Sequence, residues 1–202
     1  MSKWTEARHQ VALAGKVTYA ETGRGVEGAS VEAAGPSVVR TRTAQDGLFY
    51  FLDLPDGRYT VQASIPGAVN RYATGKTDAD VSRDKSGRIL RAAVGIALSG
   101  TAVKGKITAT GSKTGVVMAE VRIKGSGERV FSDAQGQYIL TGIEPGNRTV
   151  MVYAQGFKLA SHPVKLKEPG ALETVNFALL PEAGSNGGRS AAAGESRKAI
   201  NG

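Results

Sequence analysis

The sequence of this protein repeats itself once along its length, and the repeat limits what the chain can fold into. Thr43–Phe49 recurs 89 residues later as Ser132–Tyr138, and Val94–Leu98 recurs 81 residues later as Val175–Leu179. Several such matches follow in the same order in both halves, with only small length differences between them. Ordered matches of this kind are typical of a duplicated domain. The sequence therefore predicts two copies of one fold.

Each copy contains short strand-like runs separated by turn signals, and none shows a sustained helical period. In the first copy we expect strands over residues 11–19, 29–33, 38–43, 48–52, 59–63 and 94–98. Strict alternation in Val94-x-Ile96-x-Leu98 predicts that one side of that strand faces a core. Asp46-Gly47 predicts a hairpin, because such a tight turn needs a positive φ. About seven short strands per copy predict an all-β protein of two tandem seven-stranded β-sandwiches.

The chain divides into four expected parts. Residues 1–10 are a polar lead-in whose Trp4 we expect to pack on the first sandwich, which spans 11–99. The second sandwich spans 103–181, and the Gly/Ala/Ser-rich tail 182–202 is expected to be flexible because it cannot bury enough apolar surface. The linker 99–102 is too short for free rotation, which predicts a semi-rigid rod.

Composition excludes several classes of function. The absence of cysteine excludes disulfides, thiol catalysis and Cys-ligated metal sites. The net charge of +8 is spread along the chain, and Lys104/Lys106 and Lys165/Lys167 are each expected on a solvated strand face, so no specific nucleic-acid partner is expected. No apolar run reaches the ~18 residues of a spanning helix. The first residues lack a classical signal peptide, so we expect the protein in the cytoplasm or in an exported assembly.

Catalytic and metal-binding constellations are sparse. His9, expected in a floppy end, and His162, expected as an exposed loop residue, cannot build a catalytic triad. Asp78, Asp80, Ser82 and Asp84 are expected in an acidic surface loop. Residues 83 and 89, an arginine and an isoleucine, stand where an EF-hand needs glycine and glutamate, which argues against calcium. The aromatic residues are expected to face the core rather than a sugar. We expect no cofactor and no enzymatic activity.

A set of turn and core residues carries a resemblance to a known family. The first copy supplies Gly15-x-Val17, Thr43 to Gly47-x-Phe49, Pro55-x-Gly57-x-Tyr59 and Val94-x-Ile96-x-Leu98; the second supplies Gly105-x-Ile107, Ser132 to Gly136-x-Tyr138, Pro145-Gly146 and Val175-x-Phe177-x-Leu179. Each copy resembles the carboxypeptidase regulatory-like domain, a transthyretin-like (prealbumin-like) seven-stranded sandwich. The resemblance is specific for the fold and says little about function.

The resemblance implies structural roles for particular residues. Gly47 and Gly136 would allow a positive φ at the hairpin, and Phe49 and Tyr138 would place a ring between the sheets. Gly57 and Gly146 would close the loop that returns the chain to the opposite sheet, with Tyr59 following in the first copy. Arg148 stands where the family usually has a tyrosine, so we expect that corner to be packed differently.

These observations favour a non-catalytic structural or interaction protein, a two-sandwich adaptor or spacer in a larger assembly. Bacterial phage-tail-like contractile injection structures use transthyretin-like accessory domains and offer one analogy. The alternative is a module that binds carbohydrate or another surface ligand. The partners are expected to be other proteins, whose identity stays open, as does the oligomeric state.

Overall fold

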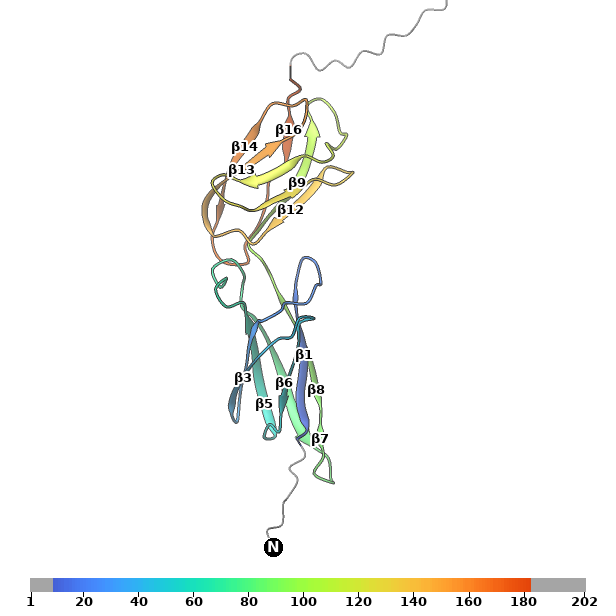
Figure 1. Ribbon diagram of the computed structural model, residues 1–202, viewed down its shortest axis with the longest axis vertical. Helices are drawn as coiled ribbons and strands as arrows, with labels where there is room; N and C mark the ends of the chain where they lie inside the picture. The colour runs from blue at the N-terminus through green and yellow to red at the C-terminus, as the bar shows by residue number, and fades with distance from the viewer. Residues whose placement is uncertain (1–8, 183–202) are drawn as a thin grey trace, which may run out of the picture.

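The computed structural model describes residues 9–182 and shows two β-sandwiches stacked end to end along the longest axis of the molecule (Figure 1). The described residues contain strands, turns and bends but no helix, and so nothing helical that could span a membrane. The predicted all-β architecture of two tandem sandwiches is confirmed. The predictions about Trp4 and about most of the tail lie outside the described residues.

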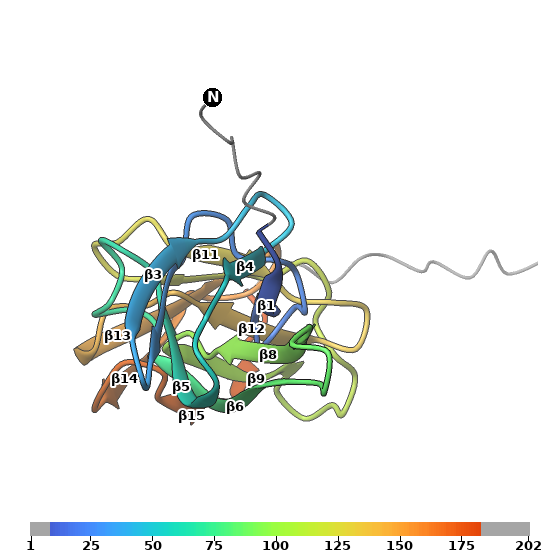
Figure 2. The ribbon, with the colours of Figure 1, turned by 90° about the horizontal axis from the view of Figure 1, so that it is seen from below.

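The first sandwich is built from two facing sheets. Its strands are β1 (Val11–Tyr19), β2 (Ser30–Ala34), β3 (Val38–Arg42), β4 (Leu48–Leu52), β5 (Gly57–Ser64), β6 (Gly75–Arg83), β7 (Ile89–Leu90) and β8 (Ala92–Leu98). One sheet has the order β4-β1-β8, and the other has the order β3-β2-β5-β6-β7 (Figure 2). Strand β1 is antiparallel to β4 and parallel to β8.

The second sandwich repeats this topology. Its strands are β9 (Ala102–Ala109), β10 (Glu120–Ile123), β11 (Arg129–Phe131), β12 (Gln137–Thr141), β13 (Gly146–Tyr153), β14 (Ala160–Leu166), β15 (Leu172–Thr174) and β16 (Phe177–Leu179). One sheet has the order β12-β9-β15 with β16 also on β9, and the other has the order β11-β10-β13-β14. Each strand thus takes the place of its counterpart in the first copy.

The strand count follows from two local features. In the second sandwich β15 and β16 are one strand interrupted at Val175–Asn176, where the backbone N–H of Lys106 donates to the Asn176 side chain at 2.8 Å. Counted together they give the seven predicted strands. The first sandwich adds the two-residue β7, which pairs with the end of β6.

The core of each sandwich lies between its sheets and follows the period of two along each strand. In β4, Phe49 and Phe51 are buried, whereas Leu48, Tyr50 and Leu52 face outward. Buried side chains from the opposite sheet meet them, including Val31, Tyr59 and Val61. Each large side chain buried in this way contributes about 1.5–3 kcal/mol. Two separate cores of this kind make each copy a folding unit of its own.

The Asp46-Gly47 turn is tight but does not form the predicted hairpin. Ala44 donates to Leu48 O at 2.8 Å and Gly47 donates to Ala44 O at 2.9 Å, which closes the turn. The strands on either side, β3 and β4, belong to opposite sheets and do not pair. The turn therefore carries the chain across the sandwich, a role that local turn chemistry cannot distinguish from a hairpin.

Residues 77–83, predicted to be part of an acidic surface loop, form most of strand β6 instead. Ala79 and Val81 point into the core, while Asp78 and Asp80 are exposed on the other face. The alternation of small apolar and acidic residues is therefore a strand pattern. The carboxylates lie in a row along a sheet and do not converge as ligands around one point.

Candidate functional site

The predicted turn glycines occupy backbone positions that side chains rarely adopt. Gly47 has φ +83° and Gly136 has φ +75°. A Cβ on Gly47 would lie 2.3 Å from the carbonyl oxygen of Val17, and one on Gly136 would lie 2.3 Å from that of Ile107. Both the φ value and the missing space therefore require glycine at these two positions.

The two returning turns also end at glycines with positive φ. Gly57 has φ +144° and Gly146 has φ +118°, and they are the first residues of β5 and β13. They stand where the chain passes from β4 and β12 back to the opposite sheet. Both therefore lie at a crossing between sheets.

The predicted aromatic residues lie inside the sandwiches. Phe49 and Tyr138 are buried, and the Tyr138 hydroxyl donates to the backbone oxygen of Val175 at 2.7 Å. Burial raises the pKa of Tyr138, so this phenol stays neutral and keeps its hydrogen bond. Gly15 makes room for the ring of Phe49, because a Cβ there would lie 2.5 Å from the ring.

The corners that follow the returning turns differ between the copies. The Tyr59 hydroxyl donates to Pro55 O, four residues earlier, at 3.1 Å. At the matching place Arg148 Nε donates to Glu144 O, also four residues earlier, at 2.9 Å. Arg148 also donates to Pro145 O at 3.0 Å. A guanidinium therefore replaces the phenol in this corner, and it reaches the side chain of Glu144 as well.

Sequence reasoning missed the role of one hydroxyl in each copy. The buried Thr43 Oγ1 donates to Val26 O and accepts from Ala29 N at 2.9 Å. Ser132 Oγ does the same in the second copy, donating to Val116 O at 2.7 Å and accepting from Ala119 N at 2.9 Å. The hydroxyl satisfies two buried backbone groups where the chain leaves one sheet for the other.

The linker between the sandwiches is hydrogen-bonded along its whole length. Ala73 donates to Ser99 O at 2.9 Å, and Thr101 donates to Arg71 O at 2.8 Å. From the other side, Ile143 donates to Thr101 O at 3.1 Å. The backbone N–H of Gly100 donates to the Glu21 carboxylate at 2.8 Å. Both sandwiches therefore hold the linker, and it cannot act as a free tether.

Arg71 connects the first sandwich to two loops of the second. Its guanidinium pairs with Glu128 and, at 2.9 Å, with Glu144, and it donates to the carbonyl oxygen of Gly142 at 3.1 Å. Glu144 also pairs with Arg148 at 3.3 Å. We call Arg71, Glu128, Glu144 and Arg148 the junction cluster. Its members are partly shielded from water, which strengthens their attraction beyond that of an exposed pair.

The electrostatics of the junction cluster favour the charged forms. Hydrogen bonds to Glu144 and Glu128 raise the pKa of Arg71. Burial alone would raise the pKa of Glu128, but hydrogen bonds from Ser126 and Arg71 outweigh it and hold that pKa below its usual value. Arg71 and Glu128 therefore carry opposite charges at neutral pH.

The repeat itself contained a signal for the junction cluster. Glu144 and Arg148 occupy the positions of Pro55 and Tyr59 in the first copy, 89 residues earlier. Departures from a repeat at two neighbouring corners mark a place where the second copy does something that the first does not. Nothing in the sequence indicated Arg71 as their partner, because 73 residues separate Arg71 from Glu144.

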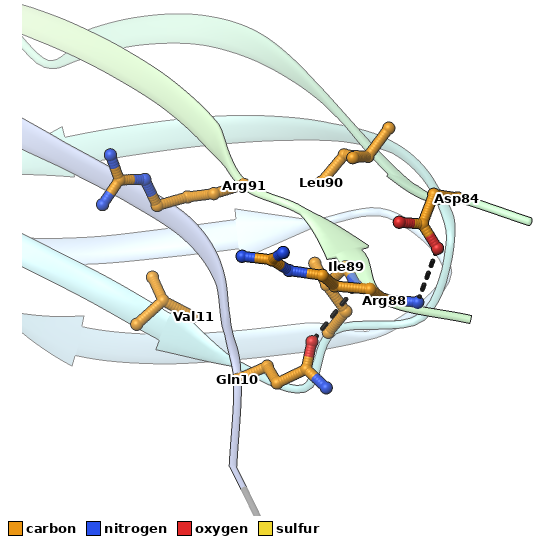
Figure 3. Close-up of a pocket in the computed structure, with 7 residues that line it drawn as sticks. All are labelled: Gln10, Val11, Asp84, Arg88, Ile89, Leu90 and Arg91. Carbon is orange, nitrogen blue, oxygen red and sulfur yellow. Dashed lines mark hydrogen bonds between the residues drawn. The ribbon is translucent and has the colours of Figure 1, made fainter. Parts of the chain in front are cut away.

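A shallow pocket lies at the free end of the first sandwich, beside the β6–β7 turn (Figure 3). Gln10 Oε1 accepts from Ile89 N at 3.1 Å, and Asp84 Oδ1 accepts from Arg88 N at 3.0 Å. Arg88 and Arg91 also line the pocket, and neither makes an ion pair with a described residue. This end therefore presents positive charge.

The two histidines lie in different sandwiches, far apart in the chain. His9, expected in a floppy end, pairs with Asp53, and Gln10 N donates to the same carboxylate at 2.9 Å. His162, expected in a loop, lies on the exposed side of β14. Asp78 pairs with Arg58 at 2.8 Å. Within residues 9–182, no three acidic or histidine side chains gather closely enough to hold a metal ion.

Not all aromatic residues face the core as expected. Tyr50 is 62% exposed on β4, and Phe131 is 48% exposed on β11. Both lie on the outward side of their strands, so the period of two places them in solvent. Single exposed rings of this kind are common on protein surfaces and do not by themselves mark a binding site.

The two sandwiches, with matching turn and core residues, define a tandem-repeat β-sandwich protein. The carboxypeptidase regulatory-like domain model matches residues 12–90 and again residues 102–180. The chain therefore belongs to this family, as its motifs predicted. No curated protein matches the sequence.

Solved structures give more distant likenesses. The Bacillus anthracis TIE protein is 17% identical, with a TM-score of 0.38, over 85% of this chain and 34% of that one. The shaft pilin SpaA from Lactobacillus rhamnosus GG is 12% identical, with a TM-score of 0.40, over 84% of this chain and 96% of that one. The chain thus spans about a third of the TIE protein. TM-scores this low do not bear on function.

Proposed function

We propose that the protein is a non-catalytic rigid spacer or adaptor that holds two surfaces at a fixed separation in a larger protein assembly. The observation that carries this proposal is the junction, where the linker is hydrogen-bonded from both sides and Arg71 bridges to two loops of the second sandwich. Domains in one chain move relative to one another by default unless their interface restrains them. A restrained junction fixes the distance and the direction between the two sandwiches, which a spacer requires.

The finer details of the proposal rest on the sequence. The boundaries 11–99 and 103–181 stay predictions, and so does the absence of catalysis. The analogy with contractile injection structures receives no support from the comparisons, and the proposal does not depend on it. The alternative, a module that binds carbohydrate or another surface ligand, would need aromatic residues exposed on loops, whereas Tyr50 and Phe131 lie on strands.

Rigidity can be measured directly because the chain has no cysteine of its own. Spin labels on Lys76→Cys and Lys165→Cys, one on each sandwich, would report the inter-domain distance by double electron–electron resonance. We expect a narrow distribution that broadens when Arg71 is replaced by alanine. Arg58→Ala, which removes an ion pair within the first sandwich, is the matched control and should leave the distribution narrow. A broad distribution in the unaltered protein would contradict a rigid spacer.

The adaptor role needs a second measurement in native cells. The tagged full chain, cross-linked and recovered for mass spectrometry, should yield protein partners linked to residues in both sandwiches. The same experiment without residues 183–202 tests whether the tail takes part in docking. Retention on a polysaccharide in place of protein partners would overturn the proposal in favour of the ligand-binding module.

A further inference from the structure

Exposed apolar side chains gather at the end of the second sandwich that points away from the first, which is the upper end in Figure 1. We call it the distal tip and define it by Val117, Met118, Phe131, Leu159, Leu180, Glu120 and Glu182. Met118 is 65% exposed and has φ +56°, a left-handed backbone that costs a side-chain-bearing residue about 1–3 kcal/mol. The tip therefore has a large apolar side chain at a position where the backbone favours glycine.

The equivalent loop of the first copy has the same backbone conformation without the apolar side chains. Gly28, with φ +67°, occupies the position of Met118, and Arg42 occupies that of Phe131. The two loops match in detail, since Gly28 N donates to Thr43 O at 3.0 Å and Met118 N donates to Ser132 O at 3.1 Å. The scaffold therefore does not require an apolar tip.

A second surface, which combines apolar side chains with two cations, lies on the outer side of the β4-β1-β8 sheet of the first sandwich. We call it the basic face and define it by Val11, Ala14, Lys16, Leu48, Tyr50, Arg91 and Ala93, which line a shallow groove of about 480 Å³. In the second copy, Lys104, Gln137 and Thr174 stand at the positions of Ala14, Leu48 and Ala93. Exposed Ile139 and Leu172 stand at those of Tyr50 and Arg91, so that face keeps apolar side chains but has no counterpart of the Arg91 charge. Again one copy departs from the other only on its surface.

The charges of these two surfaces are opposite. Among the described residues that line it, the basic face has Lys16 and Arg91 and no carboxylate. The hollows of the distal tip are lined by Glu120 and Glu182 and by no described cation. None of these four side chains makes an ion pair within residues 9–182. Arg122 lies over the ring of Tyr153 at 4.1 Å, and Tyr153 lines the same hollow as Glu120, so one cation lies beside these carboxylates without pairing with them.

We propose that the distal tip of one molecule docks on the basic face of a second copy of this chain. Apolar side chains would meet apolar side chains, and the two free carboxylates would meet the two free cations. Tip-on-tip and face-on-face contacts are disfavoured because each would oppose like charges. Residues 183–202 make a poor cover for either surface, because Ile200 is their only large apolar residue.

A tip-on-face contact is heterologous, because it uses a different surface on each molecule. Such contacts build rings when the rotation closes and open chains when it does not. This inference rests on the proposed function, because a rigid junction would fix the angle between successive molecules. It goes beyond that function by naming the partner as a second copy.

The test uses two variants of the full chain whose new residues the other copy already tolerates. Met118→Gly with Phe131→Arg alters only the distal tip, and Ala14→Lys with Leu48→Gln alters only the basic face. Unaltered protein should associate with rising concentration in sedimentation velocity. Each double variant alone should associate at least tenfold more weakly, with its circular dichroism spectrum unchanged.

Mixing the two double variants decides between heterologous and symmetric contacts. One still has an intact face and the other an intact tip, so an equimolar mixture should form a one-to-one dimer that neither forms alone. Failure of the mixture to form this dimer would overturn the proposal, as would unaltered protein that stays monomeric at the highest concentration. A monomer with a narrow inter-domain distance distribution would leave the spacer function standing, so the two failures are distinguishable.

Discussion

Single residues with an unusual backbone or a buried hydroxyl hold each sandwich at its crossings between sheets. Gly47 combines φ +83° with a lack of space, because a Cβ there would lie only 2.3 Å from the carbonyl oxygen of Val17. Thr43 satisfies two buried backbone groups with one hydroxyl. These positions tolerate few substitutions. A side chain at Gly47 would strain the backbone and clash, and loss of the Thr43 hydroxyl would leave two buried backbone groups without a partner.

Replacing Gly47 by valine should therefore lower the free energy of unfolding by more than about 2 kcal/mol. Gly23 is the matched control, because it has φ +67° with no atom near its absent Cβ. Gly23→Val should bear only the backbone cost, about 1–2 kcal/mol. Urea denaturation followed by circular dichroism measures both. A Gly47→Val protein as stable as the unaltered one would contradict the assignment.

The sequence predicted the positions of these residues better than their roles. Asp46-Gly47 signals a turn, and the chain does turn there, with Gly47 at φ +83° and Phe49 following in β4. Whether β3 and β4 pair with each other depends on contacts with β1 and β2, which a local turn signal does not contain. The hairpin prediction was wrong for that reason. The hydroxyl of Thr43 was missed because its partners lie 14 and 17 residues away.

At the scale of elements, the alternation of inward and outward side chains along a strand explains which strand predictions agree with the structure. The strand predicted over residues 48–52 matches β4, because apolar residues alternate there between two turns. Strand β6 was missed because Asp78 and Asp80 outweighed the inward Ala79 and Val81 in our interpretation. The exposed side of a strand accepts charge freely, so acidic residues at alternate positions do not argue against a strand.

The correction of β6 leads to a prediction about calcium. Asp78 is tied to Arg58 and to Thr60 across the β5–β6 pair at 2.8 and 2.9 Å, and both hydrogen bonds lower its pKa. Calorimetric titration with calcium chloride should therefore give no binding heat. Asp78→Asn should leave the free energy of unfolding almost unchanged, because an exposed ion pair contributes little to stability. Calcium binding that Asp80→Asn abolishes would contradict this interpretation.

At the scale of the whole molecule, what the two copies share makes the fold, and what they do not share makes the junction. Tyr59 and Arg148 close equivalent corners, but only the arginine also holds a carboxylate that the other sandwich can reach. The repeat was visible in the sequence, whereas the end-to-end contact was not, because Arg71 has no counterpart motif. Glu128 and Glu144 of the second copy contact Arg71 of the first, and Arg148 pairs with Glu144.

The junction cluster makes the rigidity of this rod depend on pH. The pKa of Glu128 is held below its usual value of about 4.3 in the folded protein, so its contribution to the junction is present above that value. It is lost as the pH falls through the lowered pKa, when protonation removes the charge that Arg71 binds. The inter-domain distance distribution should therefore be narrow at pH 7 and broaden on acidification below about pH 4.

Two controls separate this loosening from general acid unfolding, because Asp53 and Asp78 also have lowered pKa values. Labels on Lys16→Cys and Lys76→Cys, both within the first sandwich, should keep a narrow distribution at the pH where the inter-domain pair broadens. Glu128→Gln should already show a broader inter-domain distribution at pH 7 and respond less to acid, because the titrating group is gone. If both label pairs broaden together, the sandwich unfolds before the junction opens, and the junction cluster is not the weak point of the rod.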